Sequence, residues 1–395
     1  MSNWTFALFF VGVAWFAYEF LGYPALLALV ARIRRIRPLS SDDYLPRVSV
    51  LVSARNEERD ILWKVEETLA WDYPADRLDI LVASDASTDR TNAILAGIKN
   101  PRFRFAVMER RSGKSKALNQ LAELAKGDLL FFSDANSHID SGCLRRVVRH
   151  FADPKVGCVT GNSNRSEQGY QSGTSSGTGV YWGQEMLIRH LENKFGSVLV
   201  CDGALFCMRR SLYAPVLPEL ANDLELPLRI ARAGFWILHE PTAQVLEKDT
   251  SSPLEEFRRR RRICSQGVLG LWRLRSTLRG VRLWQFCSHK VMRWLILVPL
   301  LLLLFSSLAL AAKPPFAVFL AAQLCFYGAG LIGLALVQRG RNAGRFLTIP
   351  LYILVSAVGA FVGMIDAVTG KRYDIWESPA LSRGDEAVHL ERVRA

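Results

Sequence analysis

Acidic side chains follow two short apolar runs in the middle of this 395-residue chain. Asp85 comes just after residues 80–83, and Asp134 comes just after residues 129–132, with Asn136 two positions later. No histidine or cysteine stands with them in a ligand-like spacing, so their oxygen atoms suit a hard divalent cation such as Mg²⁺ or Mn²⁺. Such a cation binds one or two carboxylates and completes its shell with phosphate oxygens and water. These residues therefore predict a site for a metal ion and a phosphate compound.

A lysine stands where a diphosphate would be favoured. Lys114 lies in the string Gly113-Lys114-Ser115, at the start of a helical pattern that continues to Ala125. The N-terminus of a helix offers free backbone N–H groups and the positive end of the helix dipole to an anion. A P-loop interpretation of this string fails, because the residue five positions before Gly113 is Met108 and not glycine. We therefore expect Lys114 to contact phosphate oxygens outside a P-loop.

The elements that must position these residues alternate between strands and helices. Apolar, β-branched runs predict strands, and apolar residues at helical spacing predict the helices between them. The expected strands are residues 48–52, 80–83, 103–108 and 129–132. Strands separated by helical segments predict a parallel sheet, whose ligands bind at the carboxyl ends of the strands. Asp85, Asp89 and Asp134 all fall at such ends, so we expect their loops to converge on one rim.

The second half of this domain is less regular. Residues 163–179 are rich in Ser and Gly and predict a mobile surface loop. Residues 203–208 predict a strand, and the string NDLEL from residue 222 opens a helix that continues to Ala233. Five consecutive arginines, residues 258–262, precede an apolar and aromatic stretch. That combination favours a helix lying in a membrane interface.

Apolar residues gather at both ends of the chain, although it carries 50 basic and 37 acidic residues and a net charge of +13. The mean hydropathy of +0.12 excludes a disordered chain and argues against an ordinary soluble enzyme. The segments long enough to cross about 30 Å of hydrocarbon are residues 4–31, interrupted by Glu19, and the charge-free residues 294–312, 314–337 and 346–365. The arginines after the first segment predict a cytoplasmic flank and argue against a cleaved signal peptide; they are Arg32, Arg34, Arg35 and Arg37.

The sequence divides into five expected parts. An N-terminal transmembrane anchor (1–37) and an α/β domain (45–250) precede interfacial amphipathic helices (251–288), C-terminal transmembrane helices (289–370) and a tail (371–395). One anchor and three later spans place the tail on the side opposite the α/β domain, unless one span is re-entrant, and both arrangements stay open. Seven cysteines form no CxxC pair, which indicates reduced residues and no zinc site. The basic residues flank apolar spans, so we expect membrane lipid and no nucleic acid as a partner.

Six motifs occur in an order that resembles a known family. They are VSVLVSARNEE, ILVASDASTDRT, GKSKALN, LLFFSDAN, DGALFCMRRSLY and NDLELPLRIARAGFWILHEP. Over residues 46–275 the chain resembles membrane-bound inverting family 2 glycosyltransferases of the GT-A type, the group that contains cellulose, hyaluronan and bacterial exopolysaccharide synthases. The resemblance implies an α/β fold with a Rossmann-like mixed sheet. It also implies a cytoplasmic domain at a bacterial inner membrane, with flanking transmembrane and interfacial helices.

The resemblance also implies roles for individual residues. Asp223 matches the aspartate that ends the family's acidic pair and supplies the general base, which an acceptor hydroxyl needs as it attacks the anomeric carbon. Asp134 matches the first residue of the DxD motif and would hold the nucleotide sugar and the metal, with Asn136 as a second metal ligand. The residues implied in nucleotide binding are Asp85, Lys114, Asp134, Arg55 and Glu57. Those implied near the diphosphate or the acceptor are Arg260, Arg262, Glu225, Trp182 and Glu185.

Several of these residues have a structural alternative. Glu225 is equally compatible with a place on the helix surface, and Trp182 and Glu185 are equally compatible with packing. Most of the five arginines at residues 258–262 are expected to face lipid, with one of Arg260 or Arg262 at the diphosphate. Glu19 lies inside an apolar span and is costly there without a partner, which the sequence does not name.

Two departures from the family pattern bear on function. Asn136 replaces the second aspartate of the DxD motif, and an amide oxygen carries less charge toward a metal. The QxxRW motif of processive synthases lacks its tryptophan, since the corresponding stretch is RRRRI from residue 259. We therefore expect metal-assisted transfer of one sugar, with inversion, from a UDP-sugar to a lipid or glycan acceptor. The alternatives are a processive exopolysaccharide synthase and a non-catalytic membrane scaffold that binds nucleotide sugars. Donor sugar, linkage and oligomeric state stay open.

Overall fold

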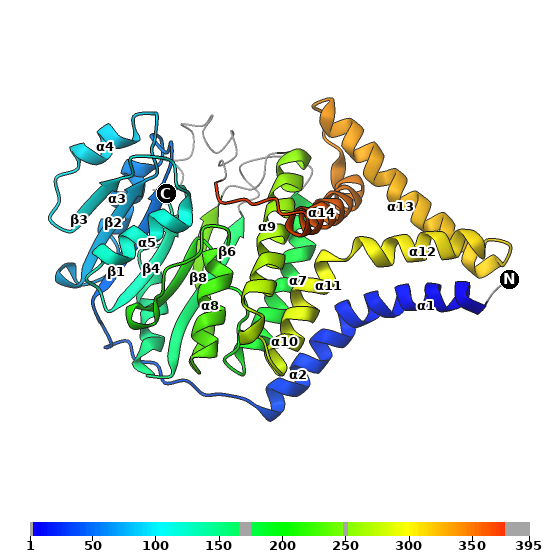
Figure 1. The fold of residues 1–395 in the computed structure, drawn as a ribbon, viewed down its shortest axis with the longest axis horizontal. Helices are drawn as coiled ribbons and strands as arrows, with labels where there is room; N and C mark the ends of the chain where they lie inside the picture. Colours follow the sequence, from blue (N-terminus) through cyan, green and yellow to red (C-terminus); the bar gives the residue numbers. More distant parts are fainter. Residues whose placement is uncertain (1–2, 166–174, 248–251, 376–395) are drawn as a thin grey trace.

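The computed structural model describes residues 3–165, 175–247 and 252–375, and it places a sheet domain beside a group of long helices (Figure 1). The sheet has eight strands in the order β3-β2-β1-β4-β7-β6-β8-β5. Their bounds are β1 (Val48–Ala54), β2 (Leu78–Ser84), β3 (Phe103–Val107), β4 (Leu129–Asp134), β5 (His138–Ile139), β6 (Val156–Arg165), β7 (Leu205–Arg209) and β8 (Trp236–Glu247).

The sheet is mixed, as expected. Strands β3, β2, β1 and β4 run parallel, whereas β7 runs antiparallel to β4 and to β6. The register pairs Ala54 with Ser84 and Ser53 with Asp134, so β1, β2 and β4 end level with one another. The prediction that the acidic loops share one rim of the sheet is therefore confirmed.

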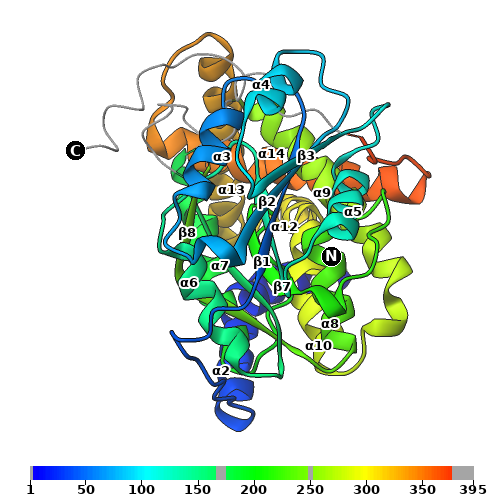
Figure 2. The same ribbon diagram turned by 90° about the vertical axis from the view of Figure 1, so that its left-hand side faces the viewer.

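Helices cover both faces of the parallel strands, because alternate side chains of each strand are apolar on both sides. Helices α3 (Ile61–Leu69), α4 (Thr91–Gly97) and α6 (Cys143–Val148) pack on the face formed by residues such as Val50 and Val52. Helices α5 (Lys114–Leu124) and α8 (Asn222–Arg232) pack on the opposite face against residues such as Leu51. Figure 2 shows α3 and α5 on opposite sides of β1 and β2.

The Ser/Gly-rich segment differs from the prediction of a loop over residues 163–179. Strand β6 continues to Arg165, because its last residues pair in parallel with Gln244 to Glu247 of β8. Helix α7 (Ser175–Asn193) already includes the last five residues of the expected loop. Residues 166–174 lie outside the described part of the chain. The Ser/Gly-rich composition therefore predicted both ends of the loop wrongly. At the first end, strand pairing overrides local propensity.

The apolar ends of the chain form the long helices of Figure 1. The N-terminal segment is α1 (Asn3–Ala17), a π-helical turn η1 (Tyr18–Gly22) and α2 (Tyr23–Ile33). The C-terminal segments are α10 (Val281–Phe286), the π-helical turn η6 (Cys287–Val291), α11 (Met292–Trp294), α12 (Leu297–Ala309), α13 (Pro314–Gln338) and α14 (Gly344–Val368). Among the described residues, three helices are long and apolar enough to cross a membrane, and a fourth candidate is the pair 281–294 and 297–309, bent by 58°.

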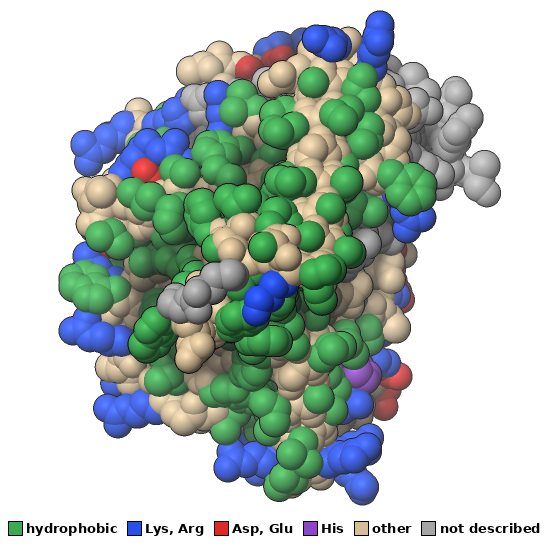
Figure 3. All heavy atoms as spheres, turned by 90° about the vertical axis from the view of Figure 1, so that its right-hand side faces the viewer, with side chains coloured by type: hydrophobic (Ala, Val, Ile, Leu, Met, Phe, Trp, Pro, Cys, Tyr) green, Lys and Arg blue, Asp and Glu red, His purple; other side chains and the backbone are tan. Residues whose placement is uncertain are grey.

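The surface of these helices agrees with a membrane environment. Figure 3 shows hydrophobic side chains over much of this face, with Lys and Arg mostly at its margin and some basic atoms near its middle. Trp4 on α1, Val318 and Leu331 on α13 are 78%, 71% and 65% exposed, which is unusual for large apolar side chains in contact with water. Burial of these side chains in hydrocarbon removes that cost.

Helix α14 differs from the other apolar helices in its direction and its contacts. It is seen nearly end-on in Figure 1, where α1 and α12 lie in the plane of the view. It packs along α9 (Pro253–Arg273) and α7, which belong to the sheet-domain side of the molecule. The tail begins beside that domain, since Gln266 Nε2 donates to the carbonyl oxygen of Tyr373 at 3.2 Å. This contact disagrees with a tail on the opposite side and favours the alternative in which one segment does not cross.

Candidate active site

Two basic and two acidic side chains lie close together at the carboxyl edge of the sheet. Lys114 is the first residue of α5, Asp134 ends β4, Asp223 lies in the first turn of α8, and Arg262 lies in the middle of α9. Lys114 Nζ donates to Asp134 Oδ1 and lies 3.4 Å from the carbonyl oxygen of Gly203. Lys114 and Arg262 both act electrostatically on Asp223, and Asp134 acts on Arg262. We call these four residues the rim cluster.

Asp223 has the environment of a proton acceptor. It is half-buried, and a methyl group added at Gly203 would lie 3.3 Å from its Oδ2 atom. Burial raises the pKa of Asp223 above its ordinary value, Lys114 and Arg262 oppose this, and the negative charge of Asp202 adds to it. A carboxylate with a raised pKa is a stronger base than an ordinary aspartate.

Arg262 keeps a positive charge over this edge. Burial and the neighbouring Arg259 lower the pKa of Arg262 to about 10, although Asp223 and Asp134 act in the opposite direction. Even so, the guanidinium stays protonated at neutral pH. Its Nη1 atom donates to Gln266 Oε1 at 3.3 Å, one turn further along α9. Lys114 and Arg262 thus approach the two carboxylates from different helices, which suits a ligand that carries several negative charges.

Asp85 fixes the loop that carries Lys114. Its Oδ1 and Oδ2 atoms accept hydrogen bonds from the backbone N–H groups of Ser112 and Gly113 at 2.6 and 2.9 Å. Gly113 has a φ of +88°, and a side chain there would collide with the backbone oxygen of Asp374. The position therefore requires glycine. The expected contact of Asp85 with a nucleoside stays a prediction.

Arg55 and Glu57 connect the loops after β1 and β2. Arg55 Nη1 donates to the carbonyl oxygens of Asp85 and Ala86 at 2.7 and 3.0 Å. The backbone N–H of Glu57 donates to Thr91 Oγ1 at 2.9 Å, and the Glu57 side chain is buried. Both residues lie at the expected edge, where they hold the two loops together. Their contact with a nucleotide stays a prediction.

The sequence patterns did not indicate Lys64, whose side chain binds the loop that follows Asp134. Lys64 on α3 is fully buried, and its Nζ atom donates to the carbonyl oxygen and Oγ of Ser137 at 2.7 and 3.3 Å. Burial lowers the pKa of Lys64, and the nearby Glu67 opposes that shift. The signal was present in the sequence, because a lysine on the same helical face as Ile61 and Val65 needs a buried partner.

The residues at the end of β4 fit a hard cation that is shared with a phosphate ligand. Asp134 offers one carboxylate, and Asn136, also half-buried, offers one amide oxygen. Within the described residues no group of three or more His, Cys, Asp or Glu side chains could hold a metal alone. Mg²⁺ usually takes one or two carboxylates and leaves its other positions to water and phosphates. Asp134 and Asn136 would therefore hold the ion only together with a diphosphate.

Three of the five consecutive arginines of α9, Arg260, Arg261 and Arg262, do not face lipid as we expected. Arg260 Nε donates to Glu256 Oε1 at 2.6 Å, and its Nη2 donates to the hydroxyl group of Tyr352 on α14. Arg261 forms two contacts with Asp366 of α14, at 2.5 and 2.9 Å. Arg260 and Arg261 join α9 to α14, because Tyr352 and Asp366 lie on the facing helix. Of the two arginines proposed for the diphosphate, Arg262 lies in the rim cluster and Arg260 does not.

The three remaining predicted residues lie away from the rim cluster or outside the description. Glu225 accepts a hydrogen bond from the backbone N–H of Leu217 at 3.1 Å and forms an ion pair with Arg229, on the other side of α8 from Asp223. Glu185 is buried at the junction of α7 with the apolar helices, where it accepts from His289 Nε2 at 2.8 Å. Trp182 belongs to α7, but its side chain is not among those described.

Glu185 belongs to a buried group of charged side chains that we call the interfacial cluster. Arg293 Nη1 donates to Glu185 Oε2 at 2.6 Å, and Lys290 Nζ lies 3.4 Å from Oε1. His289 Nδ1 pairs with Glu192 at 3.1 Å. Arg293 Nε also lies 3.6 Å from Glu19 Oε1, so Arg293 is the partner that the buried Glu19 requires. The cluster consists of Glu19, Glu185, Glu192, His289, Lys290 and Arg293.

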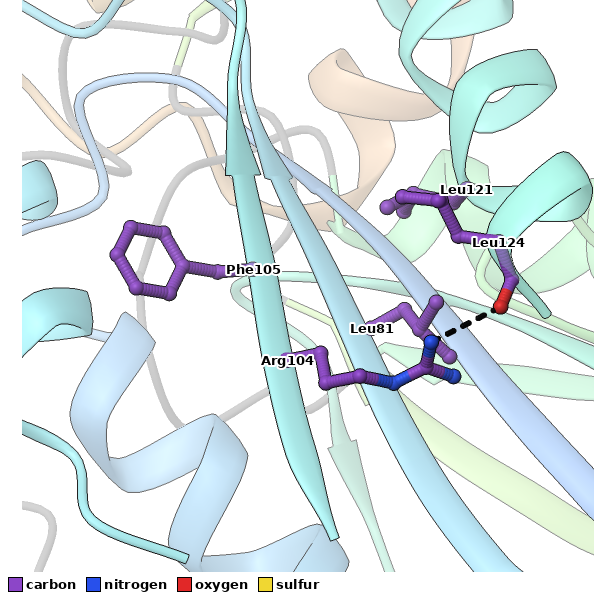
Figure 4. A pocket seen from close by; sticks show the side chains of 5 residues that line it. All are labelled: Leu81, Arg104, Phe105, Leu121 and Leu124. Atoms are coloured by element: carbon purple, nitrogen blue, oxygen red, sulfur yellow. Dashed lines mark hydrogen bonds between the residues drawn. The ribbon is translucent and has the colours of Figure 1, made fainter. Parts of the chain in front are cut away.

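An apolar cavity of about 350 Å³ lies elsewhere, at the β3 side of the sheet. Figure 4 shows its lining: Leu81, Arg104, Phe105, Leu121 and Leu124. Arg104 Nη1 donates to the carbonyl oxygen of Leu124 at 3.0 Å and so bridges the sheet and α5. No residue of the rim cluster lines this cavity, so the chemistry of the site lies outside it.

The fold and the rim cluster define a GT-A-like protein, and comparison with known proteins agrees. Residues 49–217 match the family profile Glycosyl transferase family 2. This part of the chain is therefore similar to a family 2 glycosyltransferase domain. The solved structure of the mannosyltransferase PcManGT from Pyrobaculum calidifontis, in complex with GDP-Man and Mn²⁺, superposes with a TM-score of 0.67. It is 22% identical and covers 92% of this chain and 100% of that one, which supports the fold.

Two curated relatives are glycosyltransferases. Beta-monoglucosyldiacylglycerol synthase of Synechocystis sp. is 32% identical over 175 residues, which are 40% of this chain and 36% of the relative. An N-acetylglucosaminyltransferase of Rhizobium meliloti is 29% identical over 227 residues, which are 53% of each chain. The chain thus spans between about a third and half of the length of these relatives.

Proposed function

We propose that this protein is an integral membrane glycosyltransferase that moves one sugar, with inversion, from a nucleotide-sugar donor to a lipid or glycan acceptor. The observation that carries the proposal is the rim cluster, in which a base of raised pKa, Asp223, stands beside two cations and a half-exposed carboxylate. A binding scaffold has no use for a base beside its ligand. The donor that we propose is a UDP-sugar.

The proposed reaction follows from the charges in the rim cluster. Asp223 accepts the proton of the acceptor hydroxyl as its oxygen attacks the anomeric carbon from the face opposite the diphosphate. A single displacement of this kind inverts the anomeric centre. Lys114 and Arg262 stabilise the negative charge that develops on the departing nucleoside diphosphate. A divalent cation, Mg²⁺ or Mn²⁺, held by Asp134, Asn136 and the donor phosphates, would supply further positive charge.

The acceptor and the location are proposed from the helices around the site. Helix α9 carries Arg262 and lies against the apolar helix α14, so the rim cluster stands next to the membrane part of the chain. The name of the Synechocystis relative refers to a glucosylated diacylglycerol, which supports a lipid acceptor here. The arginines after the first apolar helix support a cytoplasmic sheet domain at a bacterial inner membrane.

The test is a donor screen with the full-length protein in detergent or lipid vesicles. Release of a nucleoside diphosphate is measured for a panel of UDP- and GDP-sugars, with Mg²⁺, with Mn²⁺ and with a chelator. We expect cation-dependent release with one donor, and more of it when lipid acceptors are present. Binding of every donor without release would support the scaffold instead. A ladder of long products on a gel would show that the enzyme is processive and does not transfer a single sugar.

A further inference from the structure

A second carboxylate approaches Asp223 from a different part of the chain. The turn that precedes β7 packs against the start of α8, since the backbone N–H of Cys201 donates to the carbonyl oxygen of Asp223 at 2.9 Å. Gly203 faces the Asp223 side chain, as its close approach to Oδ2 shows. Asp202 lies between these two contacts. The residue that precedes Asp223 in the chain is Asn222, which carries no charge.

The carboxylate of Asp202 is held in place by three donors. Its Oδ2 atom accepts from the backbone N–H and the Oγ of Ser163 at 2.9 and 2.6 Å, and Oδ1 accepts from the backbone N–H of Ala204 at 3.1 Å. The residue is only 6% exposed, and the buried Arg189 interacts with it electrostatically. These hydrogen bonds hold the Asp202 carboxylate in one orientation, and its charge acts on Asp223.

The charges that face Asp223 come from every element around it. Lys114 faces it from α5 and Arg262 from α9, with Arg259 behind Arg262, and all three are cations. Asp134 on β4 is already paired with Lys114. Burial raises the pKa of Asp223, whereas the two cations lower it because they favour the ionised form. The negative charge of Asp202 acts in the same direction as burial and opposes the cations.

We propose that Asp202 is a positioning residue of the transfer reaction, whose fixed charge keeps Asp223 basic enough to accept the acceptor proton. The inference rests on the proposed function, because it assumes that Asp223 is the general base. It assigns a role to the aspartate of the DGALF motif that no feature of the sequence indicated. The turn also packs against α8 through its backbone, so charge and packing must be separated by experiment.

The experiment compares the pH dependence of nucleoside diphosphate release for the full-length protein and its variants. In Asp202→Asn the negative charge is lost, so we expect the acid limb of the profile to move to lower pH by at least about half a unit. Asp202→Glu keeps the charge, and its limb should stay at the wild-type position. The matched control is Asp153→Asn, since Asp153 is also buried and accepts from backbone N–H groups, but at the amino end of β6.

A second variant keeps the inference testable if Asp202→Asn does not fold. Arg189→Gln removes the cation beside Asp202, which also pairs with Glu185, so we expect lower stability as well. In the molecules that fold, its acid limb should move to higher pH. A lower rate at every pH with the limb unmoved in whichever variant folds would show a purely structural role and overturn the inference. Wild-type turnover in Asp223→Asn would instead overturn the assignment of the base. An inactive Asp223→Asn with an unmoved limb in Asp202→Asn would refute only the role of Asp202.

Discussion

The rim cluster and the interfacial cluster both combine carboxylates with basic side chains, but they differ in exposure and in hydrogen bonding. In the rim cluster the side chains of Lys114 and Asp134 are 25% and 30% exposed. In the interfacial cluster the side chains of Glu185, His289 and Glu192 are between 0% and 3% exposed. The single carboxylate of Glu185 pairs with four side chains, which are His289, Lys290, Arg293 and Arg189.

This difference distinguishes a site that can bind a ligand from a cluster that only joins elements of the fold. Carboxylates that accept from several buried donors have no capacity left for a ligand, and their role is to join the elements that carry the donors. The interfacial cluster joins α7 to the N-terminal helices and to the bent pair, and two π-helical turns face each other there through the Tyr18–Ser288 hydrogen bond of 2.7 Å. The rim cluster keeps exposed oxygen and nitrogen atoms at the end of the sheet, where a ligand can replace water. Four substitutions would test this contrast.

The largest effect is expected for Asp223→Asn. The amide cannot accept the acceptor proton, so we expect turnover to fall about 10²- to 10⁴-fold. Donor affinity and the unfolding temperature should change little, because the shape of the side chain is kept. Initial rates of nucleoside diphosphate release, donor binding and thermal unfolding measure the three quantities. Glu225→Gln on the same helix is the matched control and should keep near wild-type turnover. Equal losses in both variants would remove the distinction between the two sides of α8.

Glu185→Gln should show the opposite pattern, with stability lost and turnover kept in the molecules that fold. Removing one partner of a buried ion pair leaves the other charge without compensation, which costs about 3–5 kcal/mol. Burial would raise the pKa of Glu185, but His289 and Lys290 hold it well below its ordinary value. Its stabilisation is therefore complete above about pH 4.3 and lost as the pH falls further.

Thermal unfolding of wild type and Glu185→Gln as a function of pH measures this contribution. The difference between their unfolding temperatures should be large at neutral pH and should shrink in acid. Glu123→Gln, a change at an exposed glutamate of α5, is the control for loss of a single charge. A stable Glu185→Gln variant with a higher KM for the acceptor would place Glu185 in the acceptor site after all.

Local sequence patterns were sufficient for most of the fold and half of the rim cluster. The alternation of apolar strands and helices predicted β1 to β4, and strand ends predicted the shared edge of Asp85 and Asp134. These features depend on residues that are close in the chain. Lys114 was also predictable, because a glycine followed by a lysine at a helix start is a local signal.

Contacts between distant segments were not predictable from the same patterns. Lys64 and Ser137 are 73 positions apart, and Arg260 and Tyr352 are 92 positions apart. Five consecutive arginines cannot be told apart by local sequence. The packing of α9 between α14 and the sheet domain gives Arg260, Arg261 and Arg262 different partners. Composition likewise counts α14 as a span but says nothing of its direction. Tertiary packing decides these points.

Arg262→Met should have a smaller effect than the two acidic substitutions and should act on donor binding. Losing a charge-assisted hydrogen bond to the diphosphate corresponds to about 1.5–3 kcal/mol, or roughly a 10- to 100-fold increase in the KM for the donor. Arg260→Met is the matched control, because it removes the same charge one position from Arg261 but outside the rim cluster. We expect it to lower the unfolding temperature and to leave that KM unchanged. Steady-state kinetics over donor concentration measure the KM of each variant. Equal KM values for the donor would show that both arginines have a purely structural role.

The smallest effect is expected for Arg146→Ala, which tests whether proximity of opposite charges is sufficient by itself. Arg146 Nη2 lies 2.6 and 2.5 Å from the two carboxylate oxygens of Asp140, as close as any pair in the interfacial cluster. The side chains of Arg146 and Asp140 are, however, 31% and 52% exposed. Water already solvates such charges, so the free energy of unfolding should fall by less than about 1 kcal/mol, with no change in turnover. A loss as large as that of Glu185→Gln would show that distance, and not burial, distinguishes the cross-linking pairs from the rest.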